Sequence, residues 1–131
     1  MFPLREPSGV NPNAPVLDEQ TISEFRSRPD LQDNLRHSWL RMLKFYGFEA
    51  QQDPEWTVRP AANFAECAEN WLSPYNHNHL RITRILKCLR ALGLEAEARA
   101  FFNALSTIYN SRQFPGAISS VTFDYWRSAM A

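Results

Sequence analysis

The sequence predicts an all-α fold, a compact single-domain bundle of about five to six helices with an extended, proline-rich N-terminal arm. Three observations lead to this prediction. Apolar residues recur at helical spacing in several segments. Glycine, proline or serine stands near the ends of these segments. No segment of comparable length alternates apolar and polar residues. With 131 residues, of which 44% are hydrophobic, the chain can bury one core, and we expect a single domain over residues 1–131.

Residues 1–17 are expected to form an extended arm on the helical core of residues 18–131. The arm contains four prolines. Proline lacks a backbone N–H and restricts the residue before it to extended conformations, so a helix is disfavoured there. Apolar side chains such as Phe2 would dock the arm on the core. Asp18 is a suitable N-cap for a first short helix that ends near Arg26.

The clearest amphipathic helix is predicted from Pro29 to about Tyr46. At about 100° per residue one of its faces is apolar throughout. This face consists of Leu31, Leu35, Trp39, Met42, Leu43 and Tyr46. Gly47 follows directly, and a left-handed C-terminal cap favours glycine. Residues 48–58 are interpreted as a polar connection with a turn at Asp53-Pro54.

The rest of the chain predicts four more helices from the same combination of an apolar face and terminal signals. Pro60 suits the first turn of the third helix, and Gly93 ends the fourth. The expected spans are 60–72, 79–92, 95–110 and a last helix that begins at Ser119 or Ser120. Short connections between these helices favour antiparallel neighbours.

Composition excludes several classes of protein. The 14 basic and 14 acidic residues balance, so the broad positive field of a nucleic-acid-binding domain is missing and this partner is disfavoured. No stretch approaches the roughly 20 apolar residues of a membrane span, and residues 1–17 lack the apolar core of a signal peptide. Two cysteines are too few for a disulfide scaffold. We expect a cytoplasmic protein, or a nuclear one in a eukaryote.

The densest group of polar residues is Tyr75-Asn-His-Asn-His79. A metal site would join its histidines to Cys67 and Cys88, but zinc ligands usually come in close pairs, which these are not. Structural thiols are the better interpretation, and we expect no metal and no cofactor. The phosphate-loop, H-E-x-x-H and G-x-S-x-G motifs are all missing from the sequence. These observations favour a binding domain over an enzyme.

Residues 71–92 are basic, without a single acid. Arg81, Arg84, Lys87 and Arg90 fall opposite the core face of the predicted helix. This face is either a solvated surface or a site for an anion or acidic peptide. Two residues receive structural roles: Asn78 is expected to cap the helix, and Arg81 to bridge to an acid or carbonyl of a neighbouring element.

Three stretches resemble the conserved region of the opioid growth factor receptor family. Residues 77–94 are similar almost residue for residue to the family run H-N-x-L-R-I-T-R-I-L-K-x-L-x-x-L-G-L. Residues 42–47 match M-L-x-F-Y-G. Phe2-Pro3 with Asn11 is similar to the family's L-F-P and a nearby asparagine. The match spans nearly the whole chain.

The resemblance implies a non-catalytic domain that binds a peptide or a protein. Animal members are receptors for an enkephalin peptide, are cytoplasmic or nuclear, and carry long tails. This short chain is expected to be a microbial relative. The family offers no motif of known catalytic role to carry over.

Two hypotheses remain open. The first is a peptide- or protein-binding module that uses the 75–84 segment and neighbouring aromatics. The second is a small enzyme or anion-binding protein with a pocket around His77, Arg81 and Arg84. The candidate ligand-binding residues for both are Trp71, Tyr75, His77, Asn78, Arg81, Arg84 and Arg59. A closed pocket at 75–84 would favour the second hypothesis and a shallow apolar groove the first.

The start of the sequence suggests an additional expectation. Family members continue upstream of L-F-P, and here Met1 stands at its leucine. Helices that the family packs on this core would then be missing, and an uncovered apolar patch tends to be covered by association. We expect a homodimer, or a second chain, that contacts the region around Phe2.

Overall fold

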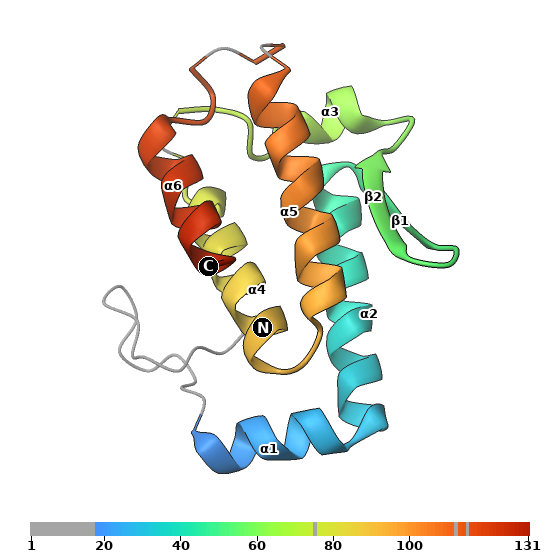
Figure 1. The fold of residues 1–131 in the computed structure, drawn as a ribbon. Helices are drawn as coiled ribbons and strands as arrows, with labels where there is room; N and C mark the ends of the chain where they lie inside the picture. The colour runs from blue at the N-terminus through green and yellow to red at the C-terminus, as the bar shows by residue number, and fades with distance from the viewer. Residues whose placement is uncertain (1–17, 75, 112, 115) are drawn as a thin grey trace.

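The computed structural model describes residues 18–131 except 75, 112 and 115, and within them the chain forms six helices and a two-stranded antiparallel sheet (Figure 1). The helices are α1 (Glu19–Ser27), α2 (Pro29–Tyr46), α3 (Phe64–Ala68), α4 (Asn78–Ala91), α5 (Glu95–Asn110) and α6 (Ser120–Ala129). The strands are β1 (Phe48–Gln52) and β2 (Trp56–Pro60). The predicted arm, Tyr75 and the expected dimer contact at Phe2 lie outside the described residues.

The all-α prediction is wrong for residues 48–60, which form a β-hairpin instead of a polar connection. Glu49 pairs with Arg59 and Ala50 with Val58 in antiparallel register. Phe48 is buried, and the sheet packs against α2 and α5. Each strand has only five residues, and Gln51 and Gln52 dilute the alternation of β1. Burial against two helices therefore supplies the stability that the local sequence signal lacks.

The predicted third helix is also corrected. Pro60 is the last residue of β2, and the helix is limited to the five residues of α3, Phe64–Ala68. Residues 69–77 then run as an irregular segment, with residue 75 not described, to the start of α4. The chain around Pro60 is extended because it continues the hairpin.

The other predicted helices are confirmed, and so are the caps predicted for α1, α2 and α6. Asp18 accepts a hydrogen bond from the Thr21 backbone N–H at 2.7 Å. Gly47 ends α2 with a left-handed φ of 91°. The hydroxyl of Ser119 accepts from the backbone N–H of Thr122 at 3.0 Å. Each cap satisfies backbone groups that a helix end leaves unpaired, so these ends could be found from local sequence.

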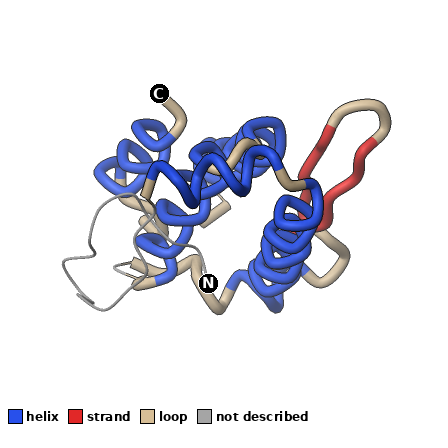
Figure 2. The backbone as a smooth tube through the Cα atoms, turned by 90° about the horizontal axis from the view of Figure 1, so that it is seen from below, coloured by secondary structure: helices blue, strands red, loops and turns tan. Residues whose placement is uncertain are grey.

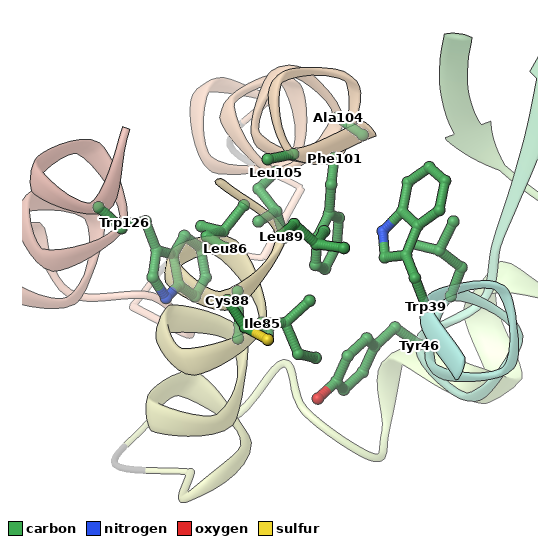
Figure 3. Close-up of a cluster of buried hydrophobic side chains, with 14 of the residues drawn as sticks. Trp39, Tyr46, Ile85, Leu86, Cys88, Leu89, Phe101, Ala104, Leu105 and Trp126 are labelled. Carbon is green, nitrogen blue, oxygen red and sulfur yellow. The ribbon is translucent and has the colours of Figure 1, made fainter. Parts of the chain in front are cut away.

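The core is a single cluster of buried apolar side chains drawn from helices throughout the described chain. Figure 3 shows Trp39 and Tyr46 of α2 on one side of the cluster and Trp126 of α6 on the other. Side chains of α4 and α5, among them Leu89 and Phe101, fill the space between them. All three of these aromatic anchors of α2 and α6 are 0% exposed.

The hairpin extends outward from the edge of the helical body (Figure 2). Its β2 strand lies along α5, whereas β1 follows directly from α2. The hairpin therefore adds a wall beside α5 that a purely helical bundle would lack.

Candidate functional site

The polar 69–79 segment is held in place by buried hydrogen bonds between aromatic side chains and backbone carbonyls. The indole N–H of Trp71 donates to the Tyr46 carbonyl at 2.9 Å. The Nε2 of His79 lies 2.7 Å from the Trp71 carbonyl, and since a carbonyl only accepts, this nitrogen carries the proton. The indole N–H of Trp126 donates to the His79 carbonyl at 3.0 Å. This chain of bonds ties α2, α4 and α6 to the segment.

Hydrogen bonds between asparagines also connect residues within this segment. The Asn70 carbonyl accepts from the side-chain amides of Asn76 at 3.2 Å and Asn78 at 2.9 Å. The Asn70 amide in turn donates to the Phe45 carbonyl at 3.1 Å. Asn78 is not the N-cap that was predicted: His77 holds that position, without a side-chain cap bond. The Oδ1 of Asn76 accepts from the Asn78 backbone N–H at 2.9 Å. Asn78 is instead the first residue of α4.

His79 is built as a structural residue. It is 6% exposed, and its ring lies edge-on to Trp126 with the centroids 5.8 Å apart. Burial lowers the pKa of the imidazole below its ordinary value of 6.5, against the opposing effect of its bond to the Trp71 carbonyl. A neutral, enclosed imidazole that already donates to a carbonyl is poorly placed to exchange protons with a substrate.

The N-cap and the first turn of α4 present three exposed side chains, His77, Leu80 and Arg81, which we call the first-turn surface. Leu80, a large apolar residue, is 57% exposed. Sequence analysis did not select Leu80, although it falls opposite the core residue Ile82 at 100° per residue. That position is the signal that could have identified it.

The bridging role predicted for Arg81 is wrong. Its side chain is exposed and, among the described residues, makes no hydrogen bond or ion pair. Its charge does act on the Tyr46 hydroxyl, which lies in the core nearby and whose pKa is raised mainly by burial. Arg90 makes the inter-element bridge instead, donating to the carbonyls of Ala129 at 3.0 Å and Ala131 at 2.7 Å.

The structure brings most of the predicted site residues together around the start of α4, but not all of them are accessible. Trp71 is fully buried and Asn78 is 4% exposed, Arg84 is half-buried, and Tyr75 lies outside the described residues. Arg59 lies elsewhere, on β2, where it forms a 2.6 Å ion pair with Glu49. Of the described site residues predicted near the start of α4, only His77 and Arg81 are exposed, and both belong to the first-turn surface.

The hairpin contributes to two clefts of the described chain. One of about 200 Å³ is lined by Glu49, Arg59 and their neighbours on the strands. The other, of about 490 Å³, lies between the hairpin turn and α5, with Trp56 and Ala100 in its walls. Neither is lined by His77, Arg81 or Arg84.

The two cysteines are free and separate. Cys88 is buried within α4, and burial raises the pKa of its thiol to about 12. The Cys67 sulfur lies 3.7 Å from the Lys44 carbonyl. No three His, Cys, Asp or Glu side chains in the described ranges are grouped to hold a metal ion. No helix of that part is long and apolar enough to cross a membrane.

Comparison with known proteins agrees with the motifs at the start of α4 and the end of α2. A family model described as "Opioid growth factor receptor (OGFr) conserved region" matches residues 1–130. The chain belongs to the opioid growth factor receptor family. It is 39% identical to the human opioid growth factor receptor over 133 residues, which cover 99% of this chain. The mouse receptor is 42% identical over 95 residues, covering 72% of this chain and 15% of that receptor.

The second branch of the family is similar as well. The opioid growth factor receptor-like protein 1 of Xenopus tropicalis is 39% identical over 95 residues, covering 72% of this chain and 18% of that protein. The chain spans about a fifth of the length of the human receptor, of which 19% is matched. No solved structure matches this member of the family.

Proposed function

We propose that this chain is a non-catalytic domain that binds a peptide or another protein through the first-turn surface of α4. Family membership supports the class of function, since the human relative is named as a receptor for an opioid growth factor. The comparison covers only a part of that receptor, so the ligand of the whole protein is carried over as a hypothesis.

The observation that carries the proposal is the contrast between the two sides of the α4 start. Its inward side chains, Asn78 and His79, are fixed by hydrogen bonds to Asn70 and Trp71. Its outward side chains, His77, Leu80 and Arg81, are exposed. An apolar side chain beside a cation on a rigid support is suited to hold a peptide, because little conformational entropy is lost on binding.

The geometry of the helix makes these three side chains one surface. His77 lies three residues before Leu80 and four before Arg81, the spacings at which side chains on a helix are neighbours. Residues 71–92 contain no acid, so Arg81 and Lys87 keep their charge uncompensated by any neighbour in sequence. A partner with an apolar side chain next to an acidic group would fit this arrangement.

The test has two stages. Polypeptides that co-purify with the native chain are identified by mass spectrometry, then synthesised and titrated calorimetrically beside an enkephalin peptide. The double variant Leu80→Ser/Arg81→Gln is expected to weaken the binding at least about tenfold, since it removes both the apolar contact and the charge.

A matched control is Val121→Ser/Arg127→Gln, which changes an exposed aliphatic residue and an exposed arginine on α6. It is expected to bind like the unaltered chain, and both double variants should keep the thermal midpoint within a few degrees. Equal affinity of the two variants, or no polypeptide that binds the purified chain, would refute the proposal.

A further inference from the structure

The cleft of about 490 Å³ between the hairpin turn and α5 is unrelated to the first-turn surface. The hairpin extends from the helical body beside α5 (Figures 1 and 2). The residues that line the cleft come from the hairpin turn and from the N-terminal half of α5. No residue of the cleft was predicted from the sequence to bind a ligand. Its walls come from two elements that are 35 or more residues apart in the chain, so only the folded structure assembles it.

One wall of the cleft is aromatic and firmly supported. Trp56 begins β2, pairs with Gln52 across the hairpin, and is half-buried. Its ring lies edge-to-face against Trp39, with the centroids 5.4 Å apart. Trp39 is 0% exposed within the core. The indole of Trp56 is therefore held in position and lines the cleft.

The opposite wall is a stripe of α5 with small side chains. Ala96, Ala100 and Asn103 line the cleft, at the four- and three-residue spacings that bring side chains onto one helix face. Ala100 is 6% exposed and lies deep in this wall. Alanines at these positions leave room beside the indole for an aliphatic chain.

Carboxylates stand on both sides of the cleft. Glu55 comes from the hairpin turn and Glu95 from the first residue of α5. Glu95 has only long ion pairs, 3.5 Å to Arg90 and 3.9 Å to Arg99. Glu55 has no ion pair with any described residue. The cleft therefore offers at least one unpaired carboxylate and a second that is only loosely paired.

We propose that this cleft binds a basic side chain, lysine or arginine, of a partner polypeptide. Such a side chain has an aliphatic stem and a cationic head. The stem packs on Ala96, Ala100 and the Trp56 indole, and the head lies between Glu55 and Glu95, where the indole adds a cation–π contribution. Arg90 and Arg99 compete for Glu95, at 3.5 and 3.9 Å, and the incoming head replaces the more distant Arg99.

This site is independent of the proposed function, because it shares no residue with the first-turn surface. The test uses the whole chain, labelled with ¹⁵N, and three decapeptides of alternating glycine with arginine, glutamine or glutamate. Chemical-shift titrations at low salt locate the binding. The arginine peptide is expected to shift the Trp56 indole and the Ala96 and Ala100 amides saturably. The other two peptides should leave these signals in place.

Variants then distinguish binding in the cleft from a general attraction of the arginine peptide to acidic residues. Glu55→Gln is expected to weaken binding of the arginine peptide several-fold, and Trp56→Leu to weaken it as well. Glu66→Gln removes an exposed acid of α3, outside the cleft, and should leave the affinity unchanged. Arg99→Ala is expected to leave the affinity equal or to raise it.

Three results would overturn the proposal. The first is that the glutamine peptide binds as tightly as the arginine peptide. The second is that the chemical-shift changes are confined to residues outside the cleft. The third is that Glu55→Gln and Glu66→Gln reduce the affinity for the arginine peptide equally. Arg81→Gln tells the two sites apart, since it should weaken ligands of the first-turn surface and leave the arginine peptide at the cleft unaffected. Either proposal can thus fail while the other stands.

Discussion

The direction in which single side chains point decides which polar residues of the α4 start serve structure. Asn78 and His79 stand in the same polar run as His77, yet the first two are buried and the third is exposed. The side chain of Asn78 donates to the Asn70 carbonyl, and that of His79 donates to the Trp71 carbonyl. Buried polar groups need such partners, because an unpaired one costs about 1–3 kcal/mol.

His79 predicts a pH dependence of stability. Burial lowers its pKa in the folded state, while in the unfolded chain it titrates near 6.5. As the pH falls, the imidazole is protonated in the unfolded chain before it is protonated in the folded one. The contribution of His79 to the free energy of unfolding is therefore fully present above about pH 6.5 and is lost as the pH falls through the folded-state pKa. In His79→Gln, which keeps a donor, the free energy of unfolding should depend less steeply on pH between about 7.5 and 5.

Urea unfolding at several pH values measures this difference. At pH 7.5 the unaltered chain should be more stable than His79→Gln by about 1 kcal/mol, and the gap should shrink towards pH 5. His77→Gln is the matched control, because His77 is exposed on the same turn. Parallel profiles for the unaltered chain and His79→Gln would show that the imidazole is not enclosed.

At the scale of elements, the end of α2 is the junction on which the hairpin and the 69–79 segment depend. Gly47 caps the helix and β1 begins one residue later. The Ala61 backbone N–H returns to the Gly47 carbonyl at 2.8 Å. The turn needs a left-handed backbone at Gly47, and α3 lies so close that a Cβ added there would be 2.8 Å from the Cys67 Cβ.

We predict that Gly47→Ala destabilises the chain more than Gly116→Ala. Both glycines have positive φ, 91° and 77°, so both substitutions incur the cost of a left-handed residue, about 1–2 kcal/mol. At position 47 an added Cβ would also lie 2.8 Å from the Cβ of Cys67 and 3.0 Å from the Phe64 backbone, whereas at 116 nothing lies within 4 Å. Crowding should add about 1–3 kcal/mol at position 47.

Equilibrium urea unfolding of the two variants gives the comparison directly. Equal losses would mean that α3 moves away from the end of α2 without resistance. In that case the packing of Phe64 against Phe48, with ring centroids 5.4 Å apart, would not hold α3 in place.

For the whole molecule, Cys88 is a reporter of global opening. It is 0% exposed on α4, within the cluster that joins α2, α4, α5 and α6. Burial raises its thiol pKa from 9.0 to about 12, so at pH 8 it carries about a thousandfold less thiolate than a thiol of ordinary pKa. In a Cys67→Ser variant, we expect a disulfide reagent to label Cys88 only through unfolding.

The labelling rate of Cys67→Ser should therefore rise with urea along the slope of the global unfolding transition. The complementary Cys88→Ala variant leaves the half-buried Cys67, and its labelling should be faster and nearly independent of urea below the transition. Rapid, urea-independent labelling of Cys88 would show that the α4 region opens locally rather than with the whole core.

The sequence by itself determined the family and every helix of the described chain except the short α3, whose predicted span was wrong. The caps at Asp18, Gly47 and Ser119 act on backbone groups within a few residues, so contiguous sequence encodes them. The apolar face of α2 follows from period 3.6 in the same way. The run from residue 77 to 94 was sufficient to indicate the family to which the chain belongs.

Only the tertiary structure decided the hairpin, the buried side of the α4 start and the cleft beside α5. Two five-residue strands carry too weak a local signal, and they form because Phe48 and Trp56 pack on the helices. The His79 imidazole is held inward by its bond to the Trp71 carbonyl and by packing on the ring of Trp126, 47 residues away. Such contacts depend on segments that meet only in the folded chain, and no pattern within a single segment can encode them.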